Sequence, residues 1–146
     1  MRRVLTILLV VLLAVTAGAC GSSNPAAPSN PGGSNSVTSL RVTDTVVGTG
    51  TVATNGRAVT VRYTGWLYDQ NAAGNKGLQF DSGTLPPFTL GTGQVISGWD
   101  QGLVGMRVGG LRTLVIPASL AYGPTARGPI PANSALVFDV ELLNVQ

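Results

Sequence analysis

Segments in which apolar and polar side chains alternate restrict the fold more than any other feature of the chain. Within residues 135–145, apolar side chains occupy every second position, and residues 58–67 alternate in the same way. Because successive side chains of a strand point to opposite faces, both segments predict strands of an antiparallel sheet with one buried face. Residues 40–47 and 111–116 are further strand candidates, separated from the others by Gly-rich turns. The buried faces would carry Leu136, Phe138, Val140 and Leu142 in one strand and Val59, Val61 and Tyr63 in the other, with Asp139, Glu141, Thr60, Arg62 and Thr64 opposite.

One segment of the domain, Ser97–Leu103, predicts a helix. Ser97 and Asp100 have the spacing of a capping box, although Asp stands where Glu or Gln is usual. Trp99 and Leu103 are four positions apart, so they would face the sheet together. The predicted fold class is therefore α+β, with a twisted antiparallel sheet packed on one short helix.

The charge and the rare residue types exclude several classes of function. The 146-residue chain has nine Lys and Arg, six Asp and Glu, no His, and Cys20 as its one cysteine. An intrachain disulfide, a Cys/His zinc site and a Ser-His or Cys-His nucleophile are therefore excluded, and we expect no cofactor and no metal. A nucleic-acid partner is not expected either, because its basic patch is missing. The arginines Arg57, Arg62, Arg107, Arg112 and Arg127 are scattered along the chain.

The N-terminus has the pattern of a secretory signal. Arg2 and Arg3 precede an apolar run, Val4–Ala19, whose 16 residues are fewer than the roughly 20 that a spanning helix needs. A permanent membrane span is therefore the weaker interpretation. The run ends in Ala17-Gly18-Ala19-Cys20, which resembles a bacterial lipobox with Ala where Leu is usual. The alternative is an ordinary cleavage site beside an incidental Cys20.

This pattern predicts three parts in the chain: a lipoprotein signal peptide at 1–19, a disordered tether at 20–36 that begins at lipidated Cys20, and one domain at 37–146. Residues 21–36 consist mainly of Gly, Ser, Asn, Pro and Ala and cannot bury enough apolar surface to order themselves. The predicted location is the bacterial cell envelope, outside the cytoplasm, with a membrane contact through the lipid. By analogy with bacterial sorting, Gly21 after Cys20 points to the outer membrane where the cell has one.

Five short motifs follow one another over residues 40–145. They are Val61-Arg62-Tyr63-Thr64-Gly65, Phe80-Asp81-Ser82, residues 93–103 (GQVISGWDQGL), residues 120–123 (LAYG), and IPAN at 130–133 followed by LVFDVELL at 136–143. In this order and at this spacing they resemble the FKBP-type peptidyl-prolyl cis/trans isomerases. The resemblance implies a five-stranded antiparallel half-barrel wrapped around one short helix. It also implies proline-containing polypeptides as substrates and a monomer.

The resemblance further implies a pocket between the helix and the concave face of the sheet. Trp99 would form its floor, and the backbone N–H of Ile96 and the hydroxyl of Tyr122 would donate to substrate carbonyls. Asp81 would be a polar partner at the rim. The implied catalytic residues are Tyr63, Phe80, Asp81, Ile96, Trp99, Tyr122 and Phe138, and the implied substrate-binding residues are Phe88, Val95 and Ile130.

These residue types suit the reaction. Rotation about a peptide bond has a barrier of roughly 18–20 kcal/mol that comes from resonance, and no bond is made or broken in crossing it. Aromatic walls would favour the twisted amide because it is less dipolar than the planar one. The missing nucleophile is therefore compatible with this chemistry.

Other interpretations remain open from the residues alone. The aromatic side chains could be the core of a small sheet domain, and Asp81 a turn or capping carboxylate. A proline-binding or chaperone-like module with little isomerase activity is the second hypothesis, favoured by a longer loop at Asn71–Gly77 and an altered rim at residues 123–129. A structural envelope lipoprotein is the third. We expect Asn71–Gly77 to be a solvent-exposed insertion.

Overall fold

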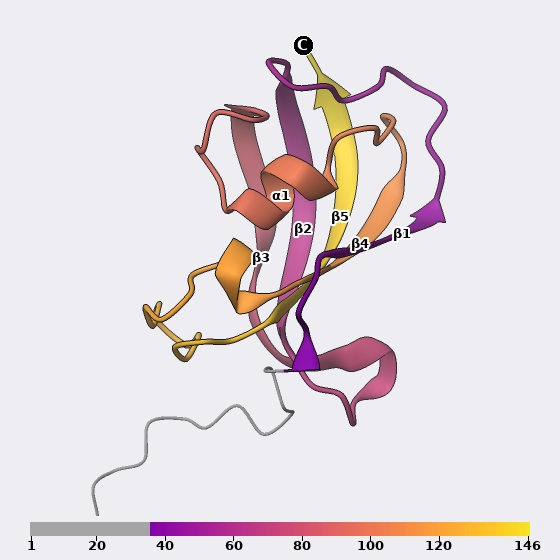
Figure 1. Cartoon of the computed structure of the whole chain (residues 1–146). Coiled ribbons are helices and arrows are strands. Elements are labelled where there is room, and N and C mark those ends of the chain that lie inside the picture. The colour runs from indigo at the N-terminus through magenta and orange to yellow at the C-terminus, as the bar shows by residue number, and fades with distance from the viewer. Residues whose placement is uncertain (1–35) are drawn as a thin grey trace, which may run out of the picture.

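A five-stranded antiparallel sheet curves around one short helix in the computed structural model, which describes residues 36–146 (Figure 1). The order across the sheet is β1-β4-β5-β2-β3, so β1 and β3 are its edges. This architecture confirms the predicted fold class. The strands are β1 (Arg41–Val46), β2 (Ala58–Tyr68), β3 (Lys76–Thr89), β4 (Leu111–Ile116) and β5 (Leu136–Val145), the helix is α1 (Ser97–Gly102), and η2 (Ala73–Asn75) and η3 (Ala118–Leu120) are single 3-10 turns.

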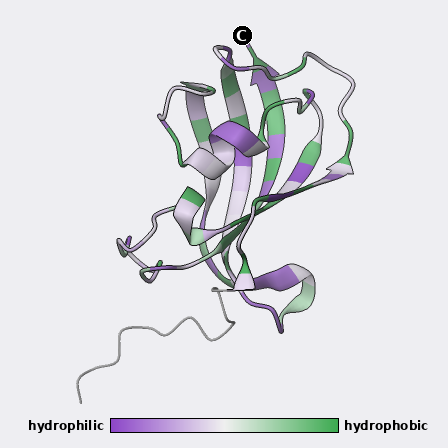
Figure 2. Cartoon of the chain, in the orientation of Figure 1, coloured by the Kyte–Doolittle hydropathy of each residue, from purple (hydrophilic) through white to green (hydrophobic). Residues whose placement is uncertain are grey.

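The alternating segments form the centre of the sheet, as their pattern predicts. β5 pairs with β4 on one side and β2 on the other, and Figure 2 shows hydrophobic and hydrophilic bands alternating along it. Leu136, Val140 and Leu142 are completely buried against the helix side, whereas Asp139 and Glu141 are partly exposed. In β2, Val59 and Val61 are also completely buried.

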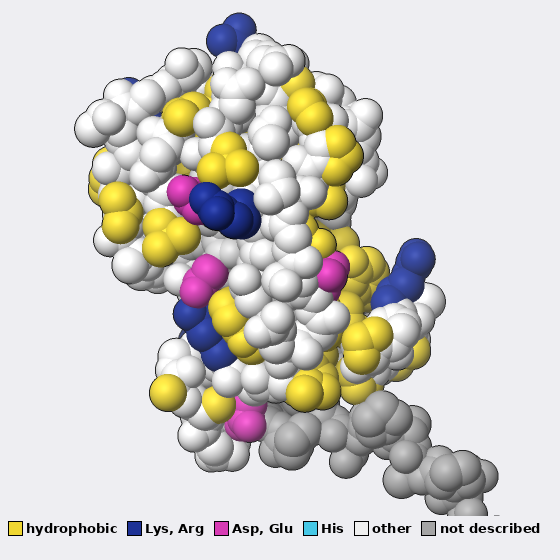
Figure 3. Space-filling view, turned by 180° about the vertical axis from the view of Figure 1, so that it is seen from behind, with side chains coloured by type: hydrophobic (Ala, Val, Ile, Leu, Met, Phe, Trp, Pro, Cys, Tyr) yellow, Lys and Arg dark blue, Asp and Glu magenta, His cyan; other side chains and the backbone are white. Residues whose placement is uncertain are grey.

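The face of the sheet turned away from α1 carries charged side chains next to one another (Figure 3). Arg62 of β2 forms an ion pair with Glu141 of β5, with Nη2 2.9 Å from Oε2, and both side chains are exposed. Lys76 pairs with Asp139, which also accepts a hydrogen bond from the Thr113 hydroxyl at 2.8 Å. The Arg62–Glu141 pair joins neighbouring strands, whereas Lys76 of β3 reaches across β2 to Asp139 of β5.

Strand β3 has no simple alternation, and its pairing with β2 shows why. The register shifts at three points along the 14 residues of β3, so its side chains change face irregularly. The predicted insertion at Asn71–Gly77 lies in the connection from β2. Its tip is exposed, as expected, but Lys76 and Gly77 are half-buried because they already belong to β3.

Helix α1 begins without the predicted capping box, and that detail of the sequence interpretation is wrong. Ile96 is the N-cap residue and no side chain caps the helix. The carboxylate of Asp100 instead accepts hydrogen bonds from the backbone N–H groups of Gly91 (2.9 Å) and Gly93 (3.0 Å). Asp100 therefore holds the loop that leads into the helix.

Two glycines let α1 lie unusually close to β4. A Cβ atom on Gly98 would be 2.4 Å from a methyl group of Ile116, and one on Gly102 would be 2.7 Å from a methyl group of Leu114. Trp99 and Leu103 are buried between helix and sheet, as their spacing predicts. The close approach excludes water from the space between α1 and β4.

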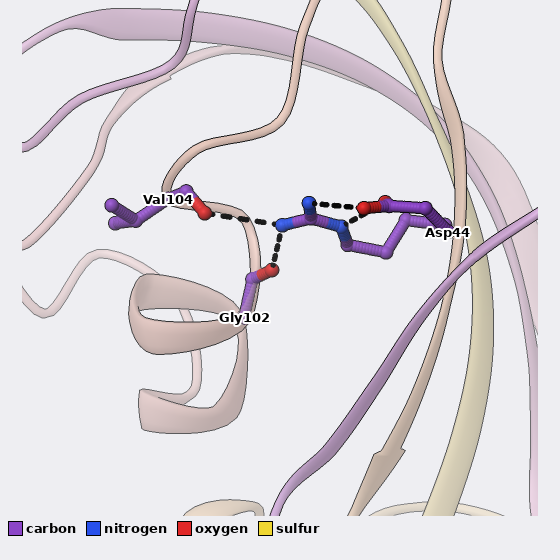
Figure 4. Close-up of polar contacts among 4 residues, drawn as sticks. Asp44, Gly102 and Val104 are labelled. Atoms are coloured by element: carbon purple, nitrogen blue, oxygen red, sulfur yellow. Dashed lines mark hydrogen bonds and ion pairs between the residues drawn. The ribbon is translucent and has the colours of Figure 1, made fainter. Parts of the chain in front are cut away.

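Arg112 is a buried cation that ties the end of α1 to the edge of the sheet (Figure 4). It rises from β4, and its Nη1 donates to the carbonyl oxygens of Gly102 (2.7 Å) and Val104 (3.1 Å). Its Nε and Nη2 donate to both carboxylate oxygens of Asp44 in β1, at 2.6 and 3.0 Å. One side chain thus satisfies two carbonyls at the C-terminal end of the helix and fixes β1.

The same contact sets the ionisation of Asp44. The hydrogen bond from Arg112 holds the pKa of Asp44 below its ordinary 3.8, the charge of Arg112 acts in the same direction, and partial burial opposes both. A carboxyl whose pKa is lowered by folding stabilises the fold above its unfolded pKa. That contribution is lost as the pH falls through the lowered pKa.

Within residues 36–146, no helix is long and apolar enough to cross a membrane. The predicted signal peptide, Cys20 and nearly all of the predicted tether lie outside the described residues. Val37 is the first buried residue of this region and packs with Tyr68, Ala135 and Val137.

We predict that Arg112→Leu lowers the free energy of unfolding by about 3 kcal/mol, because it leaves two helix carbonyls and Asp44 without their donor. Arg62→Leu is the matched control, since it breaks an exposed inter-strand pair, and we expect it to lower stability by less than about 1 kcal/mol. Denaturant unfolding of both variants measures the difference. Equal effects would show that Arg112 does not hold the helix.

Candidate active site

A cavity of about 470 Å³ opens between α1 and the concave face of the sheet. Its size is ordinary for a site that binds a small ligand or one segment of a peptide. The wall is built from β2, β3, β5, the start of α1 and the segment that follows η3. Its lining residues are Tyr63, Phe80, Asp81, Leu85, Gln94, Val95, Ile96, Trp99, Ala121, Tyr122, Arg127 and Phe138.

Trp99 forms the floor of this cavity. Its ring meets the rings of Tyr63 and Phe138 edge to face, with centroids 5.2 Å apart in both pairs, and Phe88 lies at 6.1 Å. The indole Nε1 is buried and has no hydrogen-bond partner within residues 36–146. Trp99 is therefore held by aromatic packing, and it offers the cavity an apolar surface.

Gly65 in β2 makes room for the aromatic side of the pocket. Its neighbours across the sheet are Asp81 in β3 and Phe138 in β5. A Cβ atom at this position would lie 2.7 Å from the ring of Phe80 and 2.7 Å from that of Phe138. The two rings meet edge to face over the glycine, with centroids 5.6 Å apart. A larger residue at Gly65 would push this wall apart.

Tyr63 and Asp81 form the polar part of the wall. The Tyr63 hydroxyl donates to Oδ2 of Asp81 at 2.6 Å, and the other carboxylate oxygen accepts from the backbone N–H of Ser82 at 2.9 Å. Burial, and then the hydrogen bond and charge of Asp81, raise the pKa of Tyr63 to about 12. Tyr63 is therefore a neutral hydrogen-bond donor at any physiological pH, and Asp81 orients it.

The loop before α1 is fixed by two side chains. Besides Asp100, the side-chain oxygen of Gln94 accepts from the backbone N–H of Thr89 at 2.7 Å. These bonds set the path of the chain into Val95 and Ile96, which lie on the pocket wall. A backbone donor at Ile96 would thus be held in place by the loop rather than by the helix alone.

The structure brings most of the residues implied by the resemblance together on one wall. Tyr63, Phe80, Asp81, Val95, Ile96, Trp99, Tyr122 and Phe138 all line the cavity. Phe88 and Ile130 do not: both are buried in the main core cluster, where Phe88 contacts the Trp99 ring from outside the cavity. They support the pocket instead of lining it, because their strand and loop turn them inward.

Four lining residues were not anticipated from the sequence: Leu85, Gln94, Ala121 and Arg127. Gln94 and Ala121 lie inside motifs that carry other implied site residues, so the sequence does contain a signal for them. Leu85 lies in the irregular strand β3, and Arg127 lies in the loop that departs from the family pattern. For neither residue does a regular alternation of apolar and polar positions indicate that it faces the cavity.

The chemistry available in the pocket is binding and orientation. Its ionisable side chains are Tyr63, Asp81, Tyr122 and Arg127. Among residues 36–146, no group of His, Cys, Asp or Glu side chains is arranged to hold a metal ion. An apolar floor with a few hydrogen-bond donors at its rim suits a compact, weakly polar guest.

Comparison with known proteins identifies the family. The family model for "FKBP-type peptidyl-prolyl cis-trans isomerase" matches residues 50–143. This chain belongs to that family. The match includes every residue that lines the pocket, and the FKBP-type fold agrees with the order of strands and the single short helix described above.

Relatives with this domain occur in bacteria and fungi. An FK506-binding protein of Neisseria meningitidis serogroup A is 46% identical over 112 residues, which cover 73% of this chain and 96% of that protein. FK506-binding protein 4 of Neurospora crassa is 50% identical over 113 residues, covering 75% of this chain but only 23% of the relative. The chain thus spans about a quarter of that longer fungal protein.

A solved structure also supports membership of the FKBP-type family. The crystal structure of FkpA from Escherichia coli is 39% identical to this chain and superposes with a TM-score of 0.63, covering 75% of this chain and 49% of that one. The FKBP-type domain is therefore found both alone and as part of larger chains. Peptidyl-prolyl isomerisation is the activity that names the family.

We predict that one tyrosine ionises near pH 12 and that Tyr63→Phe removes this step from a titration of phenolate absorbance. Asp81→Asn should lower the pKa of Tyr63 while leaving it above the ordinary 10.0, because burial is the larger cause. The folded pKa lies above the unfolded one, so the neutral phenol stabilises the fold below pH 10 and this contribution is lost as the pH rises toward 12.

Asp69→Asn is the control for this titration, since that carboxylate accepts only from the nearby loop at Asn71 among the bonds described. It should leave the high step in place. A titration that Tyr63→Phe does not change would contradict the assignment.

Proposed function

We propose that this chain isomerises X-Pro bonds in polypeptides outside the cytoplasm, with the prolyl ring seated on Trp99 in the aromatic pocket. The observation that carries the proposal is the open cavity whose floor and sides are Trp99, Tyr63, Phe80 and Phe138. A prolyl ring is compact and apolar, so it fits a floor of this kind. Membership of the isomerase family supports the same conclusion.

The pocket would act on the energy of the amide. The planar peptide bond is stabilised by resonance, which makes it dipolar, and rotation removes that resonance. Transfer from water to an apolar wall destabilises the dipolar planar form more than the twisted form. Since the walls are aromatic and fixed by packing, little reorganisation is needed when the bond turns.

Donors at the rim would orient the substrate chain on either side of the rotating bond. The Tyr122 hydroxyl and the backbone N–H of Ile96 are the candidates, and both residues lie on the wall. Holding the flanking carbonyls while the prolyl ring stays on Trp99 would confine the motion to the X-Pro bond. Tyr63 and Asp81 would complete the polar edge as one hydrogen-bonded pair.

The loop that favours a binding module without isomerase activity contributes nothing to the site. Asn71–Gly77 extends from one end of the sheet, and none of its residues lines the cavity. Phe80, Trp99 and Phe138 all line the cavity although this loop is long. The altered rim at residues 123–129 does reach the cavity, through Arg127, so the choice between binding alone and isomerisation belongs to the assay below.

The extracytoplasmic part of the proposal rests on the N-terminal sequence. Arg2 and Arg3, the apolar run Val4–Ala19 and the lipobox-like Ala17-Gly18-Ala19-Cys20 support export and lipid attachment. The Gly, Ser, Asn and Pro composition that follows supports a tether. An isomerase held at a membrane in this way would meet polypeptides as they emerge from export.

We predict that the full chain accelerates isomerisation of a proline peptide in a protease-free assay, and that Tyr122→Phe lowers kcat/KM about two- to tenfold by removing one hydrogen bond. Tyr68→Phe is the matched control. It makes the same change in a tyrosine buried in the small cluster with Val37, outside the cavity. We expect no change in rate from it.

Trp99→Phe tests the floor without opening the large cavity that Trp99→Ala would leave. It should reduce the rate while circular dichroism shows a folded protein. A wild-type chain that binds the peptide with no acceleration would overturn the proposal in favour of a binding module. So would a Tyr122→Phe variant with an unchanged rate together with an unchanged Trp99→Phe variant.

For the anchor, we predict that the mature protein isolated from a lipoprotein-exporting bacterium begins at Cys20 and carries lipid on it. Cys20→Ser should abolish both the lipid mass and the membrane fraction, because no other cysteine is present. Mass spectrometry of the native N-terminus measures this. An unmodified Cys20, or retention of Met1, would exclude lipidation and leave the isomerase proposal untouched.

A further inference from the structure

Arg127 is the one guanidinium among the described residues that line the pocket, and nothing in the proposed mechanism uses it. Its guanidinium carbon lies 5.5 Å from the centre of the Tyr122 ring, stacked as in a cation–π pair. The side chain is exposed to solvent. The residue thus combines a full positive charge with contact to a tyrosine on the pocket wall.

The backbone at Arg127 is fixed firmly. Arg127 and Ile130 exchange both backbone hydrogen bonds, at 2.9 and 2.8 Å, around a tight turn made by Gly128 and Pro129. Gly128 has a φ of +51°, and proline restricts the next position. Ile130 is buried in the core, so the turn is anchored from below. The charge of Arg127 is therefore held at the rim by a short, constrained turn.

The guanidinium remains available to a ligand. Within residues 36–146, no carboxylate forms an ion pair with Arg127. Within residues 36–146, no hydrogen bond comes from the Arg127 guanidinium, so its five N–H donors remain unused beside the Tyr122 ring. Those donors match a carboxylate, which can accept two of them at once.

The other charged group of the pocket wall, the Asp81 carboxylate, is not the partner of Arg127. Asp81 is the one carboxylate among the described lining residues, and both its oxygens already accept hydrogen bonds from Tyr63 and Ser82. It lies on β3, whereas Arg127 lies beyond η3 on the Tyr122 side. Asp81 thus forms no ion pair with Arg127, and the positive charge lies beside the ring of the tyrosine whose hydroxyl would bind a substrate carbonyl.

We infer that Arg127 selects substrates with an acidic side chain in a position flanking the proline. This inference rests on the proposed function, because it requires the substrate chain to pass Tyr122 with its prolyl ring on Trp99. A carboxylate adjacent to the carbonyl that Tyr122 binds reaches the guanidinium stacked on the same ring. An uncharged amide of the same shape can accept one neutral hydrogen bond there and gains less than the carboxylate.

The test compares capped peptides that differ only in Glu against Gln, placed directly before or directly after the proline, with the full chain in a protease-free assay. In the wild type at low salt, we expect the ratio of kcat/KM for the Glu peptide over the Gln peptide to be about two to five for at least one position. The ratio should fall toward one in about 1 M salt, which screens an exposed pair. Arg127→Gln should bring the ratio to one, and Arg127→Glu should invert it.

Arg57→Gln is the matched control, since it removes the same charge from an exposed position that does not line the cavity. It should leave the ratio at its wild-type value. The inference is overturned if Arg127→Gln leaves the ratio unchanged, or if Glu and Gln peptides react equally in the wild type at both positions. If either result is found while both peptides are still accelerated, the isomerase proposal stands and only the role of Arg127 is lost. If no peptide is accelerated, the proposed function itself is overturned.

Discussion

The attachment of α1 to the sheet is the contact on which the rest of this domain depends. A helix of six residues is far too short to be stable alone, so its position comes entirely from what holds it. Gly98 and Gly102 bring its backbone against β4, and Arg112 satisfies the carbonyls at its C-terminal end while binding Asp44 in β1. The contact of the helix backbone with β4 and the buried guanidinium at the C-terminal end together fix the position of the helix.

The pocket follows from that placement. With α1 pressed onto β4, the space between the helix and the strands β2, β3 and β5 stays open, and Trp99 turns toward it. The rings that complete the wall come from neighbouring strands and meet over Gly65, where any side chain would collide with them. The site is therefore an unfilled part of the core, lined by residues that a closed domain would have packed together. An apolar guest, as we propose for a prolyl ring, would complete that packing.

The sequence predicted the parts of this structure that depend on periodic burial. The alternating faces of β2 and β5 and the pairing of Trp99 with Leu103 appear as expected, since each depends only on spacing. Features that depend on a partner far along the chain gave no such signal. Arg112 stands on the buried face of β4 beside Leu114 and Ile116, and nothing local marks Asp44 as its partner. Asp100 binds a loop instead of capping its own helix, and β3 changes face at each shift of register. Phe88 and Ile130 match pocket positions of the family in sequence, but their side chains face the core. A matching sequence position does not fix the direction in which a side chain points.

The division between floor and rim has a physical basis. Floor residues stand on strands and a helix whose positions are coupled through the sheet, so a change in one would disturb the core. The rim beyond Tyr122 is a turn closed by its own two hydrogen bonds and pinned by Ile130, and residues 124–129 are exposed. Residues on such a turn can change without loss of the fold. If the pocket acts as we propose, such an isomerase would be able to alter which sequences it accepts around proline while the surface under the amide stays the same.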